Sequence, residues 1–137
     1  MKPRPLSPHL GVYKFMYTMS LSILHRITGI AASVGFLLFA GWLMALASGP
    51  ETYASAMRCL STPIAKLLLV GFTFSVIYHF CNGIRHLVWD TGRGLERAQA
   101  RRSGALVICV AVLLTALVVW LGCAALALPA MTPEAAP

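Results

Sequence analysis

The chain alternates between long apolar runs and short polar breaks. Three runs are almost free of charge: Ile27 to Ala47, Leu67 to Ile84, and Ala105 to Leu128. Because an α-helix rises about 1.5 Å per residue, roughly 20 such residues cross the hydrocarbon core of a bilayer. The pattern therefore predicts three transmembrane helices, near 21–47, 62–90 and 104–128. The runs do not alternate between polar and apolar positions, which argues against a membrane β-barrel.

The breaks between the runs carry typical helix-ending and helix-starting residues. Ser48-Gly49-Pro50 ends the first run, and Ser61-Thr62-Pro63 supplies a cap and an early-helix proline for the second. Thr91-Gly92-Arg93-Gly94 follows the second run, and Pro129 stops the third. We expect one transmembrane domain over residues 1–130 and a disordered tail over 131–137.

Composition supports the membrane assignment. Of the 137 residues, 58% are hydrophobic and only 11% are charged, and the mean hydropathy is +0.78. Soluble domains carry about 25% charged residues, and disordered chains are polar, so both classes are excluded. The four cysteines form no Cys-x-x-Cys pair, which makes a zinc site or a disulfide framework improbable.

Positive charge is unevenly distributed along the chain. Eleven Lys and Arg stand against four Asp and Glu, a formal net charge of +7. The apolar majority indicates a membrane protein with basic flanks rather than a nucleic-acid-binding protein. Only Arg58 and Lys66 fall in the first connection, whereas the N-terminal side and the second connection hold Lys2, Arg4, Lys14, Arg26, Arg85, Arg93, Arg97, Arg101 and Arg102. The positive-inside rule thus predicts a cytoplasmic N-terminus and a C-terminus outside.

A polar stripe follows one face of the second predicted helix, with the spacing i, i+3, i+4, i+7 and i+11: His79, Asn82, Gly83, His86 and Asp90. By helix rise His79 lies about 16 Å from Asp90, deep enough to be below the headgroups. The antiparallel first helix brings His25 and Arg26 to the same depth as this stripe. Polar groups in membrane helices are costly, so they are candidates for function.

Haem iron is one candidate partner for a neutral imidazole at the depth of His79. His79 and His86 are about 10 Å apart along one axis, so both cannot bind the same iron. A second axial ligand must come from another helix or subunit. Gly83 would let a flat macrocycle approach the backbone, and His25 and His86 lie nearer water, where propionates need donors. The spacing equally allows a histidine that only hydrogen-bonds to a neighbouring helix.

The first predicted helix carries a second pattern at i, i+4, i+7 and i+11: Ser22, Arg26, Gly29 and Ser33. A hydroxyl beside a guanidinium at the membrane edge suits a quinone. Ser22 can hydrogen-bond a carbonyl oxygen, and Arg26 can stabilise negative charge that develops on reduction. Taken alone, these residues favour a simpler interpretation, in which Ser22 caps the helix and Arg26 anchors phospholipid.

Three motifs in order then resemble the cytochrome b subunit of succinate dehydrogenase, the larger of two membrane anchors of respiratory complex II. They are Arg4-Pro5-Leu6-Ser7-Pro8-His9-Leu10, Ser22-Ile23-Leu24-His25-Arg26-Ile27-Thr28-Gly29, and His79 with Gly83-Ile84-Arg85-His86-Leu87 and Trp89-Asp90. The resemblance covers nearly the whole chain. No Arg- and Ser-rich transit peptide precedes the first motif, so we expect a bacterial inner membrane rather than a mitochondrion.

The resemblance implies a role for each matched residue. His79 is implied as one axial ligand of haem b, with the other supplied by the small anchor subunit. Ser22 and Arg26 are implied in the ubiquinone site, and His25, Arg26 and His86 near the haem propionates. The flavin and the iron–sulfur clusters belong to the flavoprotein and iron–sulfur subunits, so the chain is part of an oxidoreductase without binding succinate itself.

Other classes of protein remain as alternatives. A cofactor-free anchor or assembly protein has no need of the His79 stripe. A small transporter places its polar groups near the midplane, often with inverted repeats, whereas here they gather at one end and no repeat is evident. Within the family, an anchor of a quinol:fumarate reductase is the close alternative.

Overall fold

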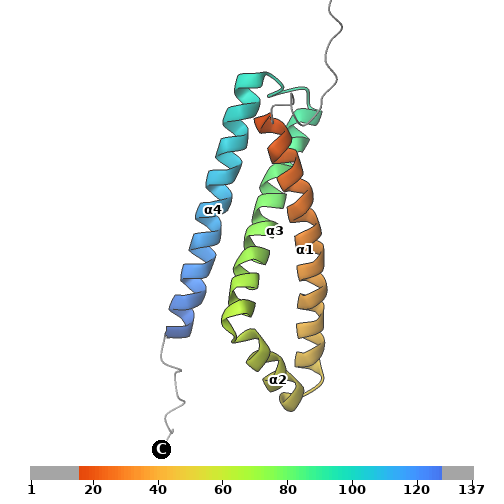
Figure 1. The fold of residues 1–137 in the computed structure, drawn as a ribbon, viewed down its shortest axis with the longest axis vertical. Helices are drawn as coiled ribbons and strands as arrows, with labels where there is room; N and C mark the ends of the chain where they lie inside the picture. Colours follow the sequence, from red (N-terminus) through yellow and green to blue (C-terminus); the bar gives the residue numbers. More distant parts are fainter. Residues whose placement is uncertain (1–15, 128–137) are drawn as a thin grey trace, which may run out of the picture.

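A computed structural model describes residues 16–127 as four helices: α1 (Tyr17–Ala47), α2 (Pro50–Leu60), α3 (Pro63–Asp90) and α4 (Arg97–Ala127). The long helices α1, α3 and α4 run lengthwise beside one another, and short α2 lies at the end where α1 and α3 connect (Figure 1). All three long helices are long and apolar enough to cross a membrane. The predicted all-α, three-span architecture is confirmed. The predicted tail over 131–137 lies outside the described residues.

Helix boundaries agree closely with the sequence pattern in two of the three spans. Thr62 caps α3 by accepting a hydrogen bond from the Ala65 backbone N–H at 3.3 Å, and Pro63 is its first residue, as predicted. α1 begins at Tyr17 after Met16, so Ser22 lies inside the helix. The interpretation of Ser22 as a helix cap is therefore wrong. α4 begins at Arg97, seven residues before the predicted 104, because its arginines are good helix formers.

The connection between the first two spans is itself helical, which the sequence pattern did not predict. Gly49 turns the chain with φ 111°, a conformation that favours glycine, and Pro50 opens α2 with its fixed φ. Glu51 in the first turn and Arg58 in the last suit the helix dipole. Eleven residues are too few to span a bilayer, so α2 connects the spans at one end of the bundle.

α3 is the central helix and packs against both α1 and α4. Tyr78 of α3 is fully buried beside Val107 and Ala111 of α4, and its hydroxyl donates to the Leu21 carbonyl of α1 at 3.3 Å. Gly104 of α4 has no Cβ, which lets the Leu21 side chain approach its backbone. This junction joins the three spans at the end of the bundle where the histidines lie.

Gly35 marks a second close approach, between α1 and α3. A Cβ there would overlap the ring of Phe72, so we expect Gly35→Ala to lower stability by about 1–3 kcal/mol through overpacking. Gly41 is the matched control in the same helix, since a Cβ there meets nothing within 4 Å. Thermal unfolding of the purified variants in detergent measures the stability of Gly35→Ala and of Gly41→Ala. Equal midpoints for the two variants would contradict this packing of α1 on α3.

Candidate functional site

Three imidazoles from two helices meet at one end of the bundle. The His25 ring on α1 stacks on the His79 ring on α3, with centroids 4.0 Å apart and an interplanar angle of 8°. The His86 ring, also on α3, lies 5.2 Å from His25 and is tilted by 42°. The structure therefore brings His25 to the depth of the α3 stripe, as the antiparallel arrangement predicted. We call His25, His79 and His86 the histidine cluster.

The orientation of His79 is fixed by a backbone hydrogen bond. Its Nδ1 lies 3.1 Å from the carbonyl oxygen of His25. A carbonyl can only accept, so this contact requires a proton on Nδ1 and leaves Nε2 with a free lone pair. Stacking with His25 uses the faces of the ring, whereas a metal is bound in the ring plane. His79 thus has the tautomer of a metal-binding imidazole.

Gly29 makes this position of His79 possible. A Cβ at Gly29 would lie 2.8 Å from Cε1 of His79, closer than real Cβ atoms approach other atoms. The sequence placed Gly29 on a face for close packing, and the structure identifies the group that packs there as the His79 ring. Gly83, one turn further along α3, has open space where its side chain would be.

His25 carries an unpaired nitrogen. Its Nδ1 is buried and has no hydrogen-bond partner in the described part of the chain. A buried polar atom left unpaired costs about 1–3 kcal/mol, so such an atom normally meets a ligand, a water or another subunit. The cluster therefore contains one free ring nitrogen on His79 and one buried, unsatisfied nitrogen on His25.

Ser22 and Arg26 lie on α1 beside the cluster. Ser22 is half-buried and Arg26 is exposed. Within residues 16–127 neither side chain makes a hydrogen bond to protein, whereas Ser33 on the same predicted face bonds to the Gly29 carbonyl at 2.9 Å. The hydroxyl and the guanidinium are thus available to a ligand at this end of α1, and Ser33 is satisfied by its own helix.

The predicted α3 stripe divides into two environments. Asn82 is 1% exposed, and its Oδ1 accepts a hydrogen bond from Nη1 of Arg85 at 3.2 Å. Asn82 therefore belongs to the interior between the helices rather than to the face of His79 and His86. Asp90 ends α3 and is exposed.

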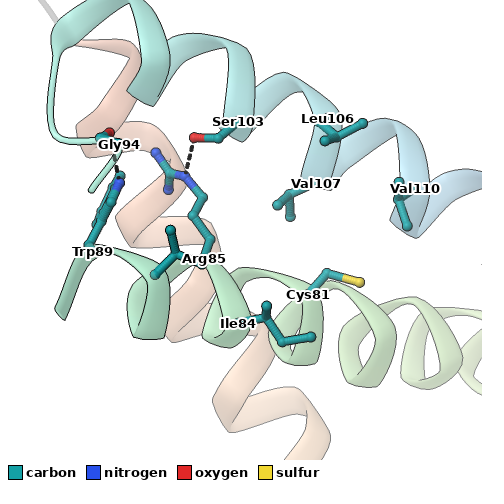
Figure 2. Close-up of a pocket in the computed structure, with 10 residues that line it drawn as sticks. Cys81, Ile84, Arg85, Trp89, Gly94, Ser103, Leu106, Val107 and Val110 are labelled. Atoms are coloured by element: carbon teal, nitrogen blue, oxygen red, sulfur yellow. Dashed lines mark hydrogen bonds between the residues drawn. The ribbon is translucent and has the colours of Figure 1, made fainter. Parts of the chain in front are cut away.

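Arg85 is the residue whose environment the sequence pattern missed. The sequence places Arg85 in the second predicted span, 62–90, but does not predict that the side chain is only 7% exposed. Figure 2 shows its side chain reaching towards α4, where Nε donates to Ser103 Oγ at 2.9 Å. Its Nη2 donates to the Ala100 carbonyl at 2.9 Å. The available signal was its spacing of three from Asn82 within an apolar run.

Trp89 connects this arginine to the histidine cluster. The Arg85 guanidinium carbon lies 3.9 Å from the centre of the Trp89 ring, a cation–π contact. The indole Nε1 donates to the Gly94 carbonyl at 3.0 Å (Figure 2). Its ring meets His86 edge to face, with centroids 5.1 Å apart. α4 therefore supports His86 through Arg85 and Trp89, although it contributes no residue to the cluster.

Replacing Arg85 by lysine tests this joint between α3 and α4. The planar guanidinium of Arg85 reaches Ser103, Asn82 and Ala100 at once. A lysine ammonium keeps the charge but cannot reach all three, so buried acceptors lose their hydrogen-bond donor. We expect Arg85→Lys to lower the free energy of unfolding by about 1–3 kcal/mol. Arg102→Lys, at an exposed position of α4, is the control and should not change it. Thermal unfolding of both variants measures the effect. An unfolding midpoint of Arg85→Lys equal to that of the wild type would contradict a stabilising contact between α3 and α4 through Arg85.

Three apolar spans with a histidine cluster at one end define a membrane protein with a candidate cofactor site. Residues 1–118 match the model of the succinate dehydrogenase/fumarate reductase transmembrane subunit. The chain belongs to this family, and the family resemblance of its motifs is confirmed.

Named relatives narrow the comparison within that family. The chain is 40% identical over 114 residues to the succinate dehydrogenase cytochrome b556 subunit of Rickettsia felis. The aligned region covers 83% of this chain and 89% of that protein. It is 40% identical over 112 residues to the mitochondrial succinate dehydrogenase cytochrome b560 subunit of Sus scrofa. It is 44% identical over 115 residues to the corresponding subunit of Mus musculus. In both mitochondrial comparisons the aligned region covers 80% of this chain and 66% of the relative.

Proposed function

We propose that this chain is the cytochrome b anchor of a succinate:ubiquinone oxidoreductase, in which it supplies one axial ligand of haem b and part of the ubiquinone site. The observation that carries the proposal is the histidine cluster, in which His79 keeps Nε2 free. Similarity to subunits named cytochrome b supports haem as the group that this nitrogen meets. Residues 1–130 form the anchor domain in this proposal.

The cluster's residues fit a haem. His79 offers the nitrogen that would hold the iron, and His25, His86 and Arg26 would lie at the propionate edge, where they would donate to carboxylates, which only accept. Gly83, one turn along α3 from His79, has open space where a side chain would be, which would let a flat macrocycle approach the backbone. When bound, the haem supplies a site that takes up and releases one electron. A histidine of the small anchor subunit would hold the haem together with His79.

Ser22 and Arg26 form this chain's part of the ubiquinone site. The hydroxyl of Ser22 donates to a quinone carbonyl oxygen, and the guanidinium of Arg26 holds the negative charge that reduction places on the ring oxygens. Both groups lack protein partners within residues 16–127, which supports a ligand at this position. In this proposal the two residues bind and orient the quinone.

Partners, orientation and location follow from the same proposal. Electrons reach the quinone from succinate through a flavoprotein subunit and an iron–sulfur subunit. The basic residues at the cluster end of the bundle dock that iron–sulfur subunit, and they place the N-terminus in the cytoplasm and the C-terminus outside. We propose a bacterial inner membrane, in line with the Rickettsia relatives.

The complex purified through this chain tests the proposed function. We expect three further subunits to copurify, a reduced-minus-oxidised spectrum with a b-type band, and ubiquinone reduction driven by succinate. Purification of the chain with neither haem nor redox subunits would overturn the proposal and favour a structural anchor. Ubiquinol-driven fumarate reduction that exceeds the succinate reaction would instead favour the fumarate reductase alternative.

A further inference from the structure

The backbone carbonyl of His25 holds the His79 ring in place. Nδ1 of His79 lies 3.1 Å from this oxygen, and within residues 16–127 the carbonyl is the one hydrogen-bond partner of the ring. The two residues meet because α1 packs against α3 (Figure 1), and Gly29 of α1 lets the ring come close to the backbone. The strength of the hydrogen bond from His79 therefore depends on what else the His25 carbonyl accepts.

The hydroxyl of Thr28 reaches the same carbonyl. Thr28 is 3% exposed, and its Oγ1 lies 3.0 Å from the His25 carbonyl oxygen and 2.9 Å from that of Leu24. A hydroxyl has one proton, so the two carbonyls share it. The other serine and threonine hydroxyls that bond back to their own helix in the described residues contact one carbonyl each, as Thr115 contacts Ala111 at 2.7 Å. Thr28 thus differs from them in reaching a carbonyl that also serves another helix.

The His25 carbonyl is crowded with donors. Inside α1 a carbonyl accepts the backbone N–H four residues later, which for His25 is that of Gly29. Nδ1 of His79 and Oγ1 of Thr28 bring the number of donors above the two lone pairs that a carbonyl oxygen has. Donors that compete for one oxygen weaken one another. The Thr28 hydroxyl therefore weakens the hydrogen bond that His79 donates.

We propose that Thr28 tunes how strongly His79 binds iron, through the shared His25 carbonyl; this inference rests on the proposed haem ligation. A metal-binding imidazole becomes a stronger electron donor as its other ring N–H donates a stronger hydrogen bond. A stronger donor favours the oxidised metal and so lowers the midpoint potential. By limiting the donation from His79, the Thr28 hydroxyl raises that potential. Thr28 is a positioning residue, because it acts through His79.

Thr28→Val tests the proposal, since valine keeps the shape of threonine and lacks the hydroxyl. The midpoint potential is measured by redox titration of the b-type band in the complex captured through this chain. We expect the variant to disfavour reduction by a factor of about 2 to 5, a part of one neutral hydrogen bond. For one electron, at about 59 mV per tenfold change, this factor lowers the potential by about 20–40 mV.

Two further variants serve as controls for the titration. Thr28→Ser keeps a hydroxyl at the same position and should keep the wild-type potential. Thr115→Val removes another buried hydroxyl that bonds within its own helix, on α4 and away from the cluster, and should also leave the potential unchanged.

NMR of the histidine ring nitrogens measures the hydrogen bond without relying on haem. In an isotope-labelled complex in the reduced state, the signals of His79 are those lost in His79→Ala. A stronger hydrogen bond from Nδ1 should shift its signal in Thr28→Val, whereas Thr115→Val should leave the signal in place. Because this measurement works with or without a bound haem, it separates the role of Thr28 from the haem ligation on which the tuning rests.

Three results would overturn the proposal. An unchanged potential in Thr28→Val would mean that the hydroxyl serves only its own helix. A raised potential would mean that Thr28 strengthens the bond from His79 instead of competing with it. An equal shift in Thr115→Val would reduce the effect to the loss of any buried hydroxyl. Absence of a b-type band from the wild type would overturn the proposed haem ligation instead, and an unchanged His79 signal in Thr28→Val would then also exclude the contact through His25.

Discussion

Replacement of His79 by alanine is expected to abolish the b-type band of the purified complex. The expectation rests on the tautomer of His79, whose Nδ1 is held 3.1 Å from the His25 carbonyl oxygen and whose Nε2 is free. An alanine has no nitrogen to offer, and His25 stacks flat against His79 rather than pointing a nitrogen at the same place. The reduced-minus-oxidised absorbance spectrum, normalised to protein, measures the loss.

His86→Ala is the matched control for this loss, since it removes an imidazole from the same helix and the same cluster. His86 contacts His25 and the Trp89 ring, and we propose that it acts near the propionates rather than on the iron. We expect this variant to keep the band. Loss of the band in His86→Ala with its retention in His79→Ala would assign the iron to His86 and overturn the proposed ligand. Subunit composition on a native gel shows whether each variant assembles.

The sequence predicted the spans because the bilayer imposes one simple requirement on them. Long uncharged runs such as Ile27 to Ala47 have no other stable place, so length and hydropathy were sufficient. The cap at Thr62 and the proline at Pro63 were also predictable from the sequence, because both act within one helical turn. α2 was missed because its residues are mixed in polarity, and its start depends on the backbone turn at Gly49.

The sequence predicted that the histidines lie together, but not the environment that the neighbouring helices give them. Helical spacing placed His79 and His86 on one face, and antiparallel spans brought His25 to their level. Spacing within α3 could not assign Asn82 to the interior, because that depends on where α4 packs. The environment of Arg85 was unpredictable for the same reason, since its partners on α4 are 15 and 18 residues away in the chain.

Those contacts give the peripheral helix α4 a part in the site. Ser103 and Ala100 hold Arg85, Arg85 lies over Trp89, and the Trp89 ring meets His86. A shift of α4 therefore changes the support of His86 without touching any histidine. Arg85→Lys consequently reports on the cluster as well as on stability, through the position of the haem band.

Arg26→Leu is expected to lower kcat/KM for ubiquinone reduction by about 10- to 100-fold. A hydrogen bond to a charged group contributes about 1.5–3 kcal/mol, and 1.4 kcal/mol is tenfold. Arg26 is exposed and makes no hydrogen bond within residues 16–127, so its removal should not disturb the helix bundle. Steady-state rates with a short-tailed ubiquinone measure the effect.

Two controls separate quinone binding from damage to the complex. Succinate oxidation with a water-soluble dye as acceptor bypasses the quinone site, so Arg26→Leu should keep the wild-type dye rate and the b-type band. Arg58→Leu removes an exposed arginine from α2, at the other end of the bundle, and should leave both reactions unchanged. Equal losses with dye and quinone in Arg26→Leu would mean that Arg26 supports assembly of the complex, because a residue of the quinone site affects only the reaction that uses quinone.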